Sequence, residues 1–330
     1  ADQCLAAAKK AWTWAQTNSS IHFSLAGGTG NYEDDNGSKS FNDEKAWASN
    51  ELYIATGEAT YYNATDFLND NYCYLEEPSW QKTSGLGLLS LVNNLSNLSS
   101  LTSIQKDAIK TKFLNFADSL ADIWDASGYK IMTNRHWWGI NSIVATQGLF
   151  FLDAYRLTSE DRYLNAAVSH MDYVFGRNPT RYSYVTWLGD KTPQNPHDRR
   201  SASDGISKPI PGYMVGGACN NDCIDCAGAG KSYADDQSNY TYNEIAINWN
   251  APVVYLMCGV ANTFLFKGAY FTNAIIQTDS KHLQVSVSNT LKTTSVTSSS
   301  ASSFLVKVGA NDIQVTDLSL DATSKVLTLT

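Results

Sequence analysis

Polar and aromatic side chains are concentrated in YADDQSNYTYNEIAINWNAP, residues 233–252, directly ahead of an apolar run. Glu244 is a candidate proton donor, because Tyr240, Tyr242 and Trp249 can exclude water around it and favour its neutral carboxyl form. A carboxyl that is held neutral in this way can donate a proton to a leaving group as a general acid. The structural alternative is a carboxylate that stabilises the first turn of a helix through the helix dipole.

Aromatic rings would complement such a site. The axial C–H faces of a pyranose stack on Trp or Tyr, and its equatorial hydroxyls reach polar neighbours. Each ring could equally belong to the core, and we favour that interpretation for Trp12 and Trp47 because of their helical spacing among Ala and Leu. The candidates for stacking are Trp137, Trp138, Trp187 and Tyr240.

Composition limits the classes of partner. The formal net charge of −8 argues against nucleic acid and anionic membranes, which bind basic surfaces, and favours a neutral polymer or small molecule. Charged residues are only 17% and aromatic residues 12%, a profile that suits a secreted protein handling sugars. The apolar run 251–266 contains Pro252 and Asn262, so we interpret it as a buried helix and predict no membrane span. We expect any signal peptide to have been removed or to lie outside this sequence.

The cysteines and the glycosylation sequons give further indications of compartment. Cys219, Cys223 and Cys226 have a spacing compatible with zinc, but no His lies near enough to complete a familiar ligand set. In a secreted protein we favour disulfides for these cysteines. Six Asn-x-Ser/Thr sequons support a secreted glycoprotein, and they begin at Asn18, Asn36, Asn63, Asn94, Asn97 and Asn239.

Most of the chain is predicted to be helical. Gly57 suits the left-handed residue that ends a helix, and Ser159 suits a cap that opens one. Apolar residues at helical spacing predict helices over 4–17, 43–56, 59–70, 84–94, 103–124, 141–157, 160–175 and 243–266.

Two other regions break this helical pattern. Residues 176–242 are rich in Gly, Pro, Asn and Asp but also in Tyr and Trp, which favours a functional loop over a disordered insert. After Phe266, the segments HLQVSVS, SFLVKV, IQVTDLSL and KVLTLT alternate apolar and polar residues. This period of two predicts a small β-sandwich-like module over 268–330, which we expect to be incomplete.

Two stretches resemble the signature regions of glycoside hydrolase family 9, the inverting endoglucanases with an (α/α)6 barrel. Weaker similarities lie in DEKAWASNELYIATGEATYY and in HWWGINS, so the resemblance covers roughly residues 1–267. In YVFGRNPTRYSYVTWLGDKTPQNPHDRRS, residues 173–201, the matching positions are Ser183, Val185, Thr186, Gly189, Lys191, Pro196, His197 and Arg199. In residues 233–252 they are Tyr233, Asp235, Tyr240, Glu244, Ala246, Asn250 and Ala251.

The resemblance implies roles for particular residues. Glu244 would be the general acid, and Asp235 a second active-site carboxylate that orients or binds the sugar, with helix capping as its alternative. His197 and Arg199 would contact the substrate, although PHDR by itself is also typical of a surface turn. Asp43 and Glu44 match an Asp-Glu pair that contributes oxygen ligands to a structural calcium, and they could instead cap a helix. No other cofactor is implied.

The resemblance also implies a mainly α fold, an (α/α)6 toroid over residues 1–267 that is incomplete at its N-terminus. The predicted helices fall short of the twelve that such a toroid contains. The Asp-x-Gly-Asp motif that supplies the family's catalytic base is absent from the sequence, and GNYEDDNG and DASGYK are its nearest approximations. We therefore expect the base to come from a segment ahead of Ala1.

Three functional hypotheses follow. The first is a secreted, endoglucanase-like hydrolase of β-1,4-glucan or cello-oligosaccharides. The second is a non-catalytic glucan-binding or structural extracellular glycoprotein on a degenerate hydrolase fold, which the missing base motivates. In the third, the edges of the β module attach the protein to an extracellular matrix or a neighbouring subunit.

Overall fold

The computed structural model describes most of the chain. The residues described are 1–19, 21, 41–79, 82–131, 133, 136–219, 229–265, 271–279, 281–287, 291, 296–308, 311–321, 323 and 325–330. They form two compact units, Ala1–Val260 and Ala261–Thr330. The domain bounds of 1–267 and 268–330 stay a prediction. No helix in the described part of the chain is long and apolar enough to cross a membrane.

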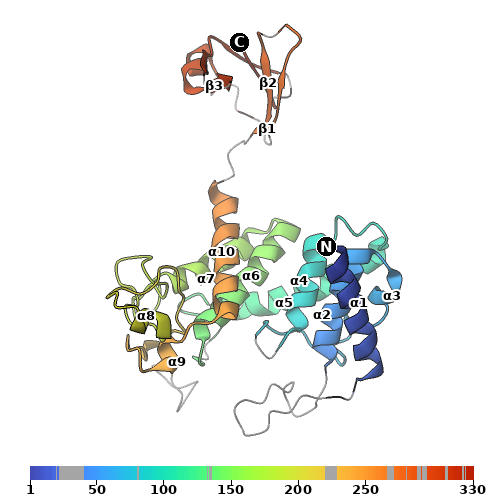
Figure 1. Ribbon diagram of the computed structural model, residues 1–330, viewed down its shortest axis with the longest axis vertical. Helices are drawn as coiled ribbons and strands as arrows, with labels where there is room; N and C mark the ends of the chain where they lie inside the picture. The colour runs from blue at the N-terminus through green and yellow to red at the C-terminus, as the bar shows by residue number, and fades with distance from the viewer. Residues whose placement is uncertain are drawn as a thin grey trace. The chain divides into compact units, whose positions relative to one another are not determined.

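The larger unit is helical (Figure 1). Its elements are α1 (Asp2–Thr17), α2 (Asn42–Thr56), α3 (Ala59–Tyr62), α4 (Ser84–Asn94), α5 (Ser103–Ala126), α6 (Ile140–Thr158), α7 (Asp161–Val174), α8 (Arg199–Ser203), η1 (Ala229–Lys231), α9 (Tyr240–Asn243) and α10 (Ile247–Leu265), the last of which runs past the boundary between the units.

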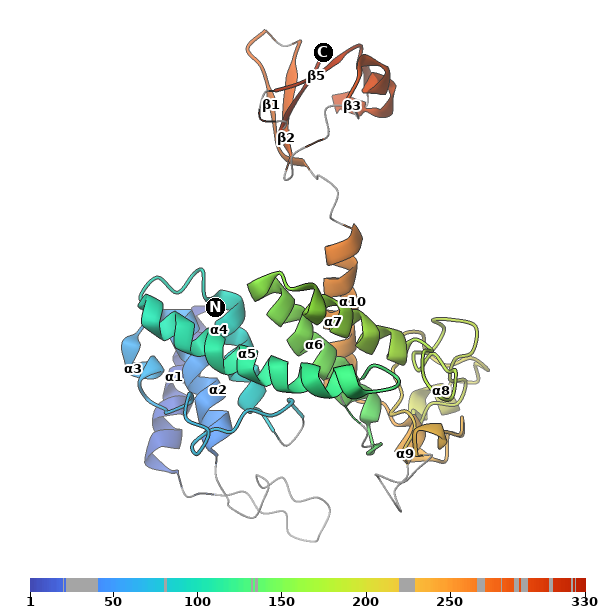
Figure 2. The ribbon, with the colours of Figure 1, turned by 180° about the vertical axis from the view of Figure 1, so that it is seen from behind.

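Four of these helices, α2, α4, α6 and α10, run in the same direction and form one layer. The Asp43 carboxylate at the start of α2 accepts hydrogen bonds from the Thr83 backbone N–H (2.8 Å) and hydroxyl (3.1 Å) at the start of α4. Further along, α4 is joined to α6 by a bond from Asn93 to Asp153, and α6 to α10 by a bond from Tyr255 to Asp153. Helices α1, α5 and α7 pack against this layer, and Figure 2 shows α5 in front of α4 and α6.

Asp153 is the polar centre of the layer. Its side chain is 1% exposed, yet it accepts hydrogen bonds from three elements: Asn93 Nδ2 (2.8 Å), Tyr255 Oη (2.8 Å) and Arg156 Nη1 (2.6 Å). A buried carboxylate is tolerated only when it is paired and hydrogen-bonded. The network therefore fixes α4, α6 and α10 relative to one another.

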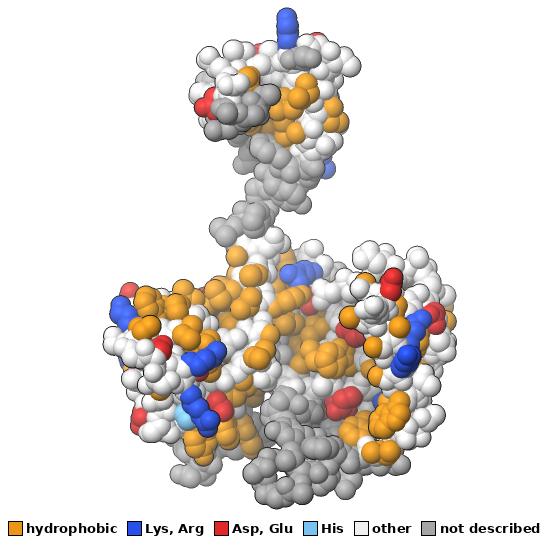
Figure 3. Space-filling view, viewed as in Figure 1, with side chains coloured by type: hydrophobic (Ala, Val, Ile, Leu, Met, Phe, Trp, Pro, Cys, Tyr) orange, Lys and Arg blue, Asp and Glu red, His pale blue; other side chains and the backbone are white. Residues whose placement is uncertain are grey.

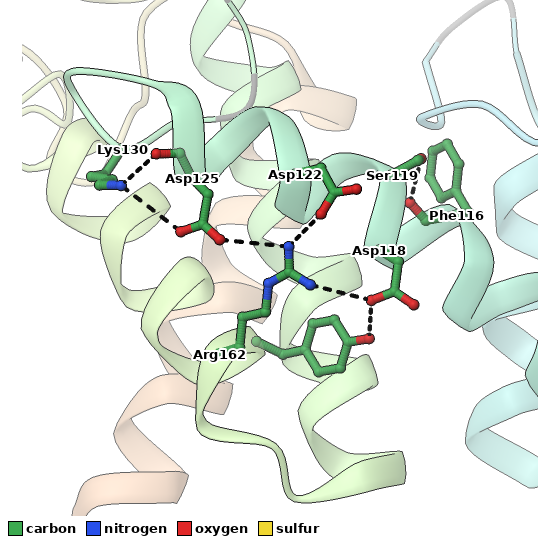
Figure 4. A network of polar contacts seen from close by, with 8 residues as sticks. Phe116, Asp118, Ser119, Asp122, Asp125, Lys130 and Arg162 are labelled. Atoms are coloured by element: carbon green, nitrogen blue, oxygen red, sulfur yellow. Dashed lines mark hydrogen bonds and ion pairs between the residues drawn. The ribbon is translucent and has the colours of Figure 1, made fainter.

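A second polar network joins α5 to α7 at the surface (Figure 4). Arg162 of α7 lies among three aspartates of α5, with its Nη atoms 3.7 Å from Asp118, 2.5 Å from Asp122 and 3.6 Å from Asp125. Lys130 donates to the Asp125 carbonyl oxygen at 2.8 Å. These side chains are solvated, so each pair contributes about 0.2–1 kcal/mol, and the network orients the two helices more than it stabilises them.

The smaller unit is an antiparallel β module. One sheet has the strand order β1-β2-β6-β5, and β3 and β4 form a separate hairpin. Its core contains Val285, Val287, Leu327 and Leu329, at the alternating positions that the sequence predicted to face inward. The elements are β1 (Phe271–Ile276), β2 (Leu283–Val287), η3 (Ser298–Ser303), β3 (Leu305–Val308), β4 (Asn311–Gln314), β5 (Leu318–Leu320) and β6 (Val326–Leu329).

The structure corrects several local predictions. The predicted helix 59–70 ends at Tyr62, because Asp66 and Asn69 hydrogen-bond each other in a turn. Ser159 does not open a helix; it ends α6 in the left-handed conformation (φ 62°), and Glu160 precedes α7. Gly57 has the predicted left-handed conformation (φ 71°). Trp47, predicted to be core, is 36% exposed.

Candidate active site

The long segment after α7 is folded tightly around buried asparagines. Asn178 is 4% exposed; its Nδ2 donates to the carbonyl oxygens of Tyr173 (2.7 Å) and Tyr182 (2.8 Å). Further along, Val185 and Met214 pair in an antiparallel bridge. Residues 176–219 and 229–242 therefore fold against α6, α7 and α10, and Tyr184, Val185, Met214 and Val215 of the loop share one buried core with these helices.

Asn243 holds the stretch that carries the candidate acid. Its side chain is fully buried and donates to the carbonyl oxygens of Ala234 (2.6 Å) and Asp236 (2.9 Å). Its Oδ1 accepts a hydrogen bond from Tyr233 Oη at 2.8 Å. Burial, together with the charge of Asp235, raises the pKa of Tyr233, so this hydroxyl stays a donor.

Asp235 joins this stretch to the loop that carries His197. Its two carboxylate oxygens accept hydrogen bonds from the backbone N–H groups of Gln194 (2.8 Å) and Asn195 (2.9 Å). Both oxygens therefore help to fix the main chain. This geometry suits an orienting carboxylate better than one that reacts.

Main-chain bonds bring Glu244 and His197 side by side. The two residues form a parallel bridge, in which His197 N–H donates to the Asn243 carbonyl at 2.7 Å. The Glu244 carbonyl accepts a bond from Gly216 N–H at 3.0 Å. Glu244 is extended (φ −61°, ψ 147°) and lies between α9 and α10. It is therefore outside the first helical turn that the structural alternative required.

The Glu244 side chain is half-buried, and no hydrogen bond or ion pair joins its carboxylate to another described residue. His197 differs, because its Nδ1 lies 2.7 Å from the Gln237 carbonyl oxygen. A proton on Nδ1 would make that bond and leave Nε2 available to a ligand.

An aromatic cluster lies at the same place. The Tyr240 ring is 5.1 Å from the Trp138 ring and 6.1 Å from the His197 ring, measured between centroids. Trp138 and Tyr240 are 41% and 48% exposed, so they offer ring surface to a ligand. Trp137, the neighbour of Trp138 in the chain, is 54% exposed.

Two other candidate residues lie outside this cluster. Trp187 has a left-handed backbone (φ 68°), donates its Nε1–H to the Pro209 carbonyl at 2.7 Å, and lies below the Lys208 ammonium. No contact joins its ring to the described rings of the cluster. Arg199 begins α8 and is exposed, with no partner for its guanidinium among the described residues.

Asp43 and Glu44, the residues of the predicted calcium site, lie at the start of α2. Within the described ranges, no three His, Cys, Asp or Glu side chains group closely enough to hold an ion, whereas calcium takes six to eight oxygen ligands. Burial opposes ionisation of Asp43, but hydrogen bonds from Glu44 and Thr83 outweigh it and lower its pKa. The carboxylate instead joins α2 to α4.

Cys223 and Cys226 of the predicted zinc or disulfide cluster lie outside the described residues, and so does the sequon at Asn36. Cys4, Cys73 and Cys258 are free thiols.

Gly139 should be essential for the local geometry, because it joins Trp138 to α6 with φ 80° and a Cβ there would lie 2.6 Å from Trp249 Cζ2. We expect Gly139→Ala to lower the free energy of unfolding by about 2–3 kcal/mol, from backbone strain plus overpacking. Gly57→Ala is the matched control, since Gly57 has φ 71° but no atom near its Cβ position, and should cost about 1 kcal/mol. If urea unfolding showed the same loss of free energy of unfolding for Gly139→Ala and Gly57→Ala, that result would contradict the importance of the contact with Trp249.

Sequence reasoning missed Asn243, whose side chain fixes residues 233–239. Its only signal is its place directly before Glu244, and the four groups that its side chain binds follow no periodic pattern.

Comparison with known proteins places this helical unit and loop among glycosidases. The family model described as Glycosyl hydrolase family 9 matches residues 1–257. Endoglucanase D of Acetivibrio thermocellus is 33% identical over 269 residues, which are 79% of this chain and 40% of the relative. The xyloglucan-specific endo-beta-1,4-glucanase BoGH9A of Bacteroides ovatus is 33% identical over 77% of this chain and 45% of its own length.

Solved structures agree with the sequence comparison. A Bacteroides ovatus family 9 structure superposes with a TM-score of 0.67 at 33% identity, over 78% of this chain and 48% of that one. A metagenome-derived family 9 endoglucanase gives a TM-score of 0.68 at 30% identity, over 79% and 47% of the two chains. AaCel9A in complex with cellobiose-like isofagomine gives 0.67 at 26% identity, over 81% and 51%.

The chain belongs to glycosyl hydrolase family 9. This confirms the resemblance and the predicted fold class, the mainly α, (α/α)6 type followed by a small antiparallel β module. The chain spans less than half the length of these two curated relatives.

Proposed function

We propose that this chain carries the acid side of the active site of a secreted, inverting endo-β-1,4-glucanase. The observation that supports this most directly is the Glu244 carboxyl, held by main-chain bonds beside His197 and left without a partner among the described residues. A general acid needs a fixed position and a carboxyl that no neighbouring cation holds in the ionised form.

In this proposal Glu244 protonates the leaving oxygen. His197 Nε2 accepts a hydrogen bond from one sugar hydroxyl and the Arg199 guanidinium donates to another, while Asp235 positions the loop of His197. Trp138 and Tyr240 stack on sugar faces, and Trp137 and Trp187 extend the binding surface. The two carboxyl groups of this reaction need no cofactor.

The base must be an ionised carboxylate about 6.5–9.5 Å from Glu244, with room for a water molecule between them. Asp235 suits this role less well, because the hydrogen bonds that its two oxygens accept from the backbone of residues 194 and 195 tie it to the loop of His197. We propose that a segment outside this sequence supplies the base. Because Asp-x-Gly-Asp is absent from the chain, we retain a second candidate function, which is glucan binding without hydrolysis.

Binding of cellohexaose by the chain should depend on the aromatic cluster. Trp138→Ala removes one face of the Trp138–Tyr240 pair, and we expect about tenfold weaker binding, equivalent to about 1.4 kcal/mol. Titration followed by tryptophan fluorescence measures this. Trp14→Ala is the control: Trp14 is 57% exposed on α1, and its loss should leave the affinity unchanged. Equal losses in both variants, or no binding by the unmodified chain, would argue against the site.

A further inference from the structure

A groove on the helical unit lies between α5 and the chain that follows α3. It has a volume of about 530 Å³ and is here called the α5 groove. Asp70 and Tyr74 line it from the chain after α3, and Thr111, Asn115 and Ser119 line it from α5. None of its lining residues belongs to the candidate active site. Figure 2 shows α3 and α9 on opposite sides of the unit, so the groove is a separate surface.

Three side chains of α5 form a row along the groove, because Thr111, Asn115 and Ser119 are four residues apart. Four residues of an α-helix rise about 6 Å, which is close to the length of one pyranose unit in a glucan chain. The side chains of Thr111 and Asn115 are exposed and have no hydrogen-bond partner among the described residues. Ser119 donates to the Phe116 carbonyl at 2.7 Å, as Figure 4 shows, and can still accept a hydrogen bond. The row therefore offers hydroxyl and amide groups at the repeat of a sugar chain.

Tyr74 gives the groove a flat aromatic face. It is 65% exposed, so its ring presents surface that a ligand can cover. Leu75 and Phe116 add apolar surface in the same groove. A pyranose binds such a place with two kinds of contact, because its axial C–H groups stack on an aromatic ring while its equatorial hydroxyls reach polar side chains. Tyr74 and the row on α5 supply both kinds.

The groove carries no net charge. Its only charged lining residues are Asp70 and Lys112, whose side chains form an ion pair at 2.9 Å. The Lys112 side chain is 12% exposed and also donates to the Cys73 carbonyl at 3.0 Å, which fixes the chain after α3 to α5. An anionic ligand would meet no unpaired cation in this groove, and the formal net charge of −8 would repel it. These features favour a neutral ligand.

Exposed hydrophobic side chains elsewhere lack this combination. Figure 3 shows hydrophobic side chains gathered along α10, where Ile247 and Val254 are 91% and 56% exposed. Aliphatic side chains have no flat face on which a sugar ring can stack. The mixture of an aromatic face with a polar row, rather than apolar area alone, therefore selects a sugar as the ligand of the α5 groove.

We propose that the α5 groove is a second binding site for a neutral β-linked glucan, apart from the site of hydrolysis. One pyranose stacks on Tyr74, and the hydroxyls of the sugar chain exchange hydrogen bonds with Thr111 and Asn115. The groove takes no part in the proposed reaction, so this goes beyond the proposed function, although the choice of a glucan as ligand rests on it. A polymer held in the groove has a raised local concentration at the active site.

Hydroxyl-radical footprinting of the chain with cellohexaose tests the proposal, because oxidation of an exposed aromatic side chain slows when a ligand covers it. Tyr74 reports on the α5 groove, while Trp138 and Tyr240 report on the candidate active site. Tyr129 is the control for radicals consumed by the sugar, since it is 46% exposed and lines neither place. We expect saturating cellohexaose to slow oxidation of Tyr74 by at least about twofold relative to Tyr129, because a stacked sugar covers one of the two faces of the ring.

A variant of the polar row keeps Tyr74 as the reporter. Asn115→Ala removes one hydrogen bond to the sugar, and we expect it to raise the cellohexaose concentration that half-protects Tyr74 by about three- to tenfold. Asp107→Ala, on the same helix but outside the groove, should leave that concentration unchanged. An oligogalacturonate of similar length carries carboxylates and should protect Tyr74 much less than cellohexaose does.

Three results would overturn the proposal: no slowing of Tyr74 beyond that of Tyr129, equal effects of Asn115→Ala and Asp107→Ala, or equal protection by oligogalacturonate, which would indicate a site for anions. The same experiment distinguishes the two sites. Protection of Tyr74 without protection of Trp138 and Tyr240 would support the α5 groove and contradict the proposed active site. The reverse pattern would support the proposed active site and remove the α5 groove.

Discussion

Glu244→Gln is expected to lower the release of reducing ends from carboxymethylcellulose by about 10²- to 10⁴-fold, the usual contribution of a general acid. The amide has nearly the shape of the acid but has no acidic proton for the leaving oxygen. Binding of cellohexaose should change little, because the main-chain bonds of residue 244 to Tyr240 and Gly216 do not involve the side chain.

Hydrolysis should be measured both on the chain alone and on its assembly with a segment that supplies the base, and cellohexaose binding on the chain alone. Glu160→Gln is the matched control, since Glu160 is exposed and makes no capping hydrogen bond at the start of α7. Activity of the Glu244→Gln variant equal to that of the unmodified assembly would refute the role of Glu244. Binding without hydrolysis in the unmodified assembly would favour the glucan-binding alternative.

Asp153→Ala should be the most destabilising of the substitutions considered. Removing one member of a buried ion pair costs about 3–5 kcal/mol, and we expect about 3 kcal/mol because Arg156 is 40% exposed and can turn towards water. The hydroxyl of Tyr255 and the amide of Asn93 would also lose their acceptor.

Urea unfolding measures this loss, with an unchanged m-value indicating that only stability has changed. Asp107→Ala is the control, because Asp107 is 72% exposed and its nearest cation, Lys110, is 4.0 Å away. That variant should lose less than about 0.5 kcal/mol. Similar losses in the two variants would show that the Asp153 network does not hold the helices together.

Helix positions were predictable because their signals are local. The segment 84–94 and the left-handed Gly57 follow directly from apolar spacing and from glycine's conformational freedom. The prediction for Ser159 was wrong because a residue between two helices can end the first or open the second. Its backbone φ of 62° shows that Ser159 ends α6. Strand β1 was missed because FTNAII lacks strict alternation.

The candidate site could be predicted as a set of residue types but not as a geometry. Motif spacing identified Glu244, His197 and Tyr240, and the structure brings these three together. The extended backbone of Glu244 depends on Gly216, which is distant in sequence and gives no periodic signal. The two backbone groups that Asp235 binds are likewise distant in sequence, and they are consistent with the orienting role that the resemblance implies for it.

The long loop after α7 is held mainly by hydrogen bonds to its main chain, and this affects which of its residues can change. Asn178, Asp235 and Asn243 bind mainly carbonyl and amide groups of the main chain, which every substitution other than proline preserves. Exposed side chains such as Trp187 and Ile206 can therefore be exchanged without moving Glu244. Selection could in this way change the surface of the loop while Glu244, the proposed proton donor, keeps its place.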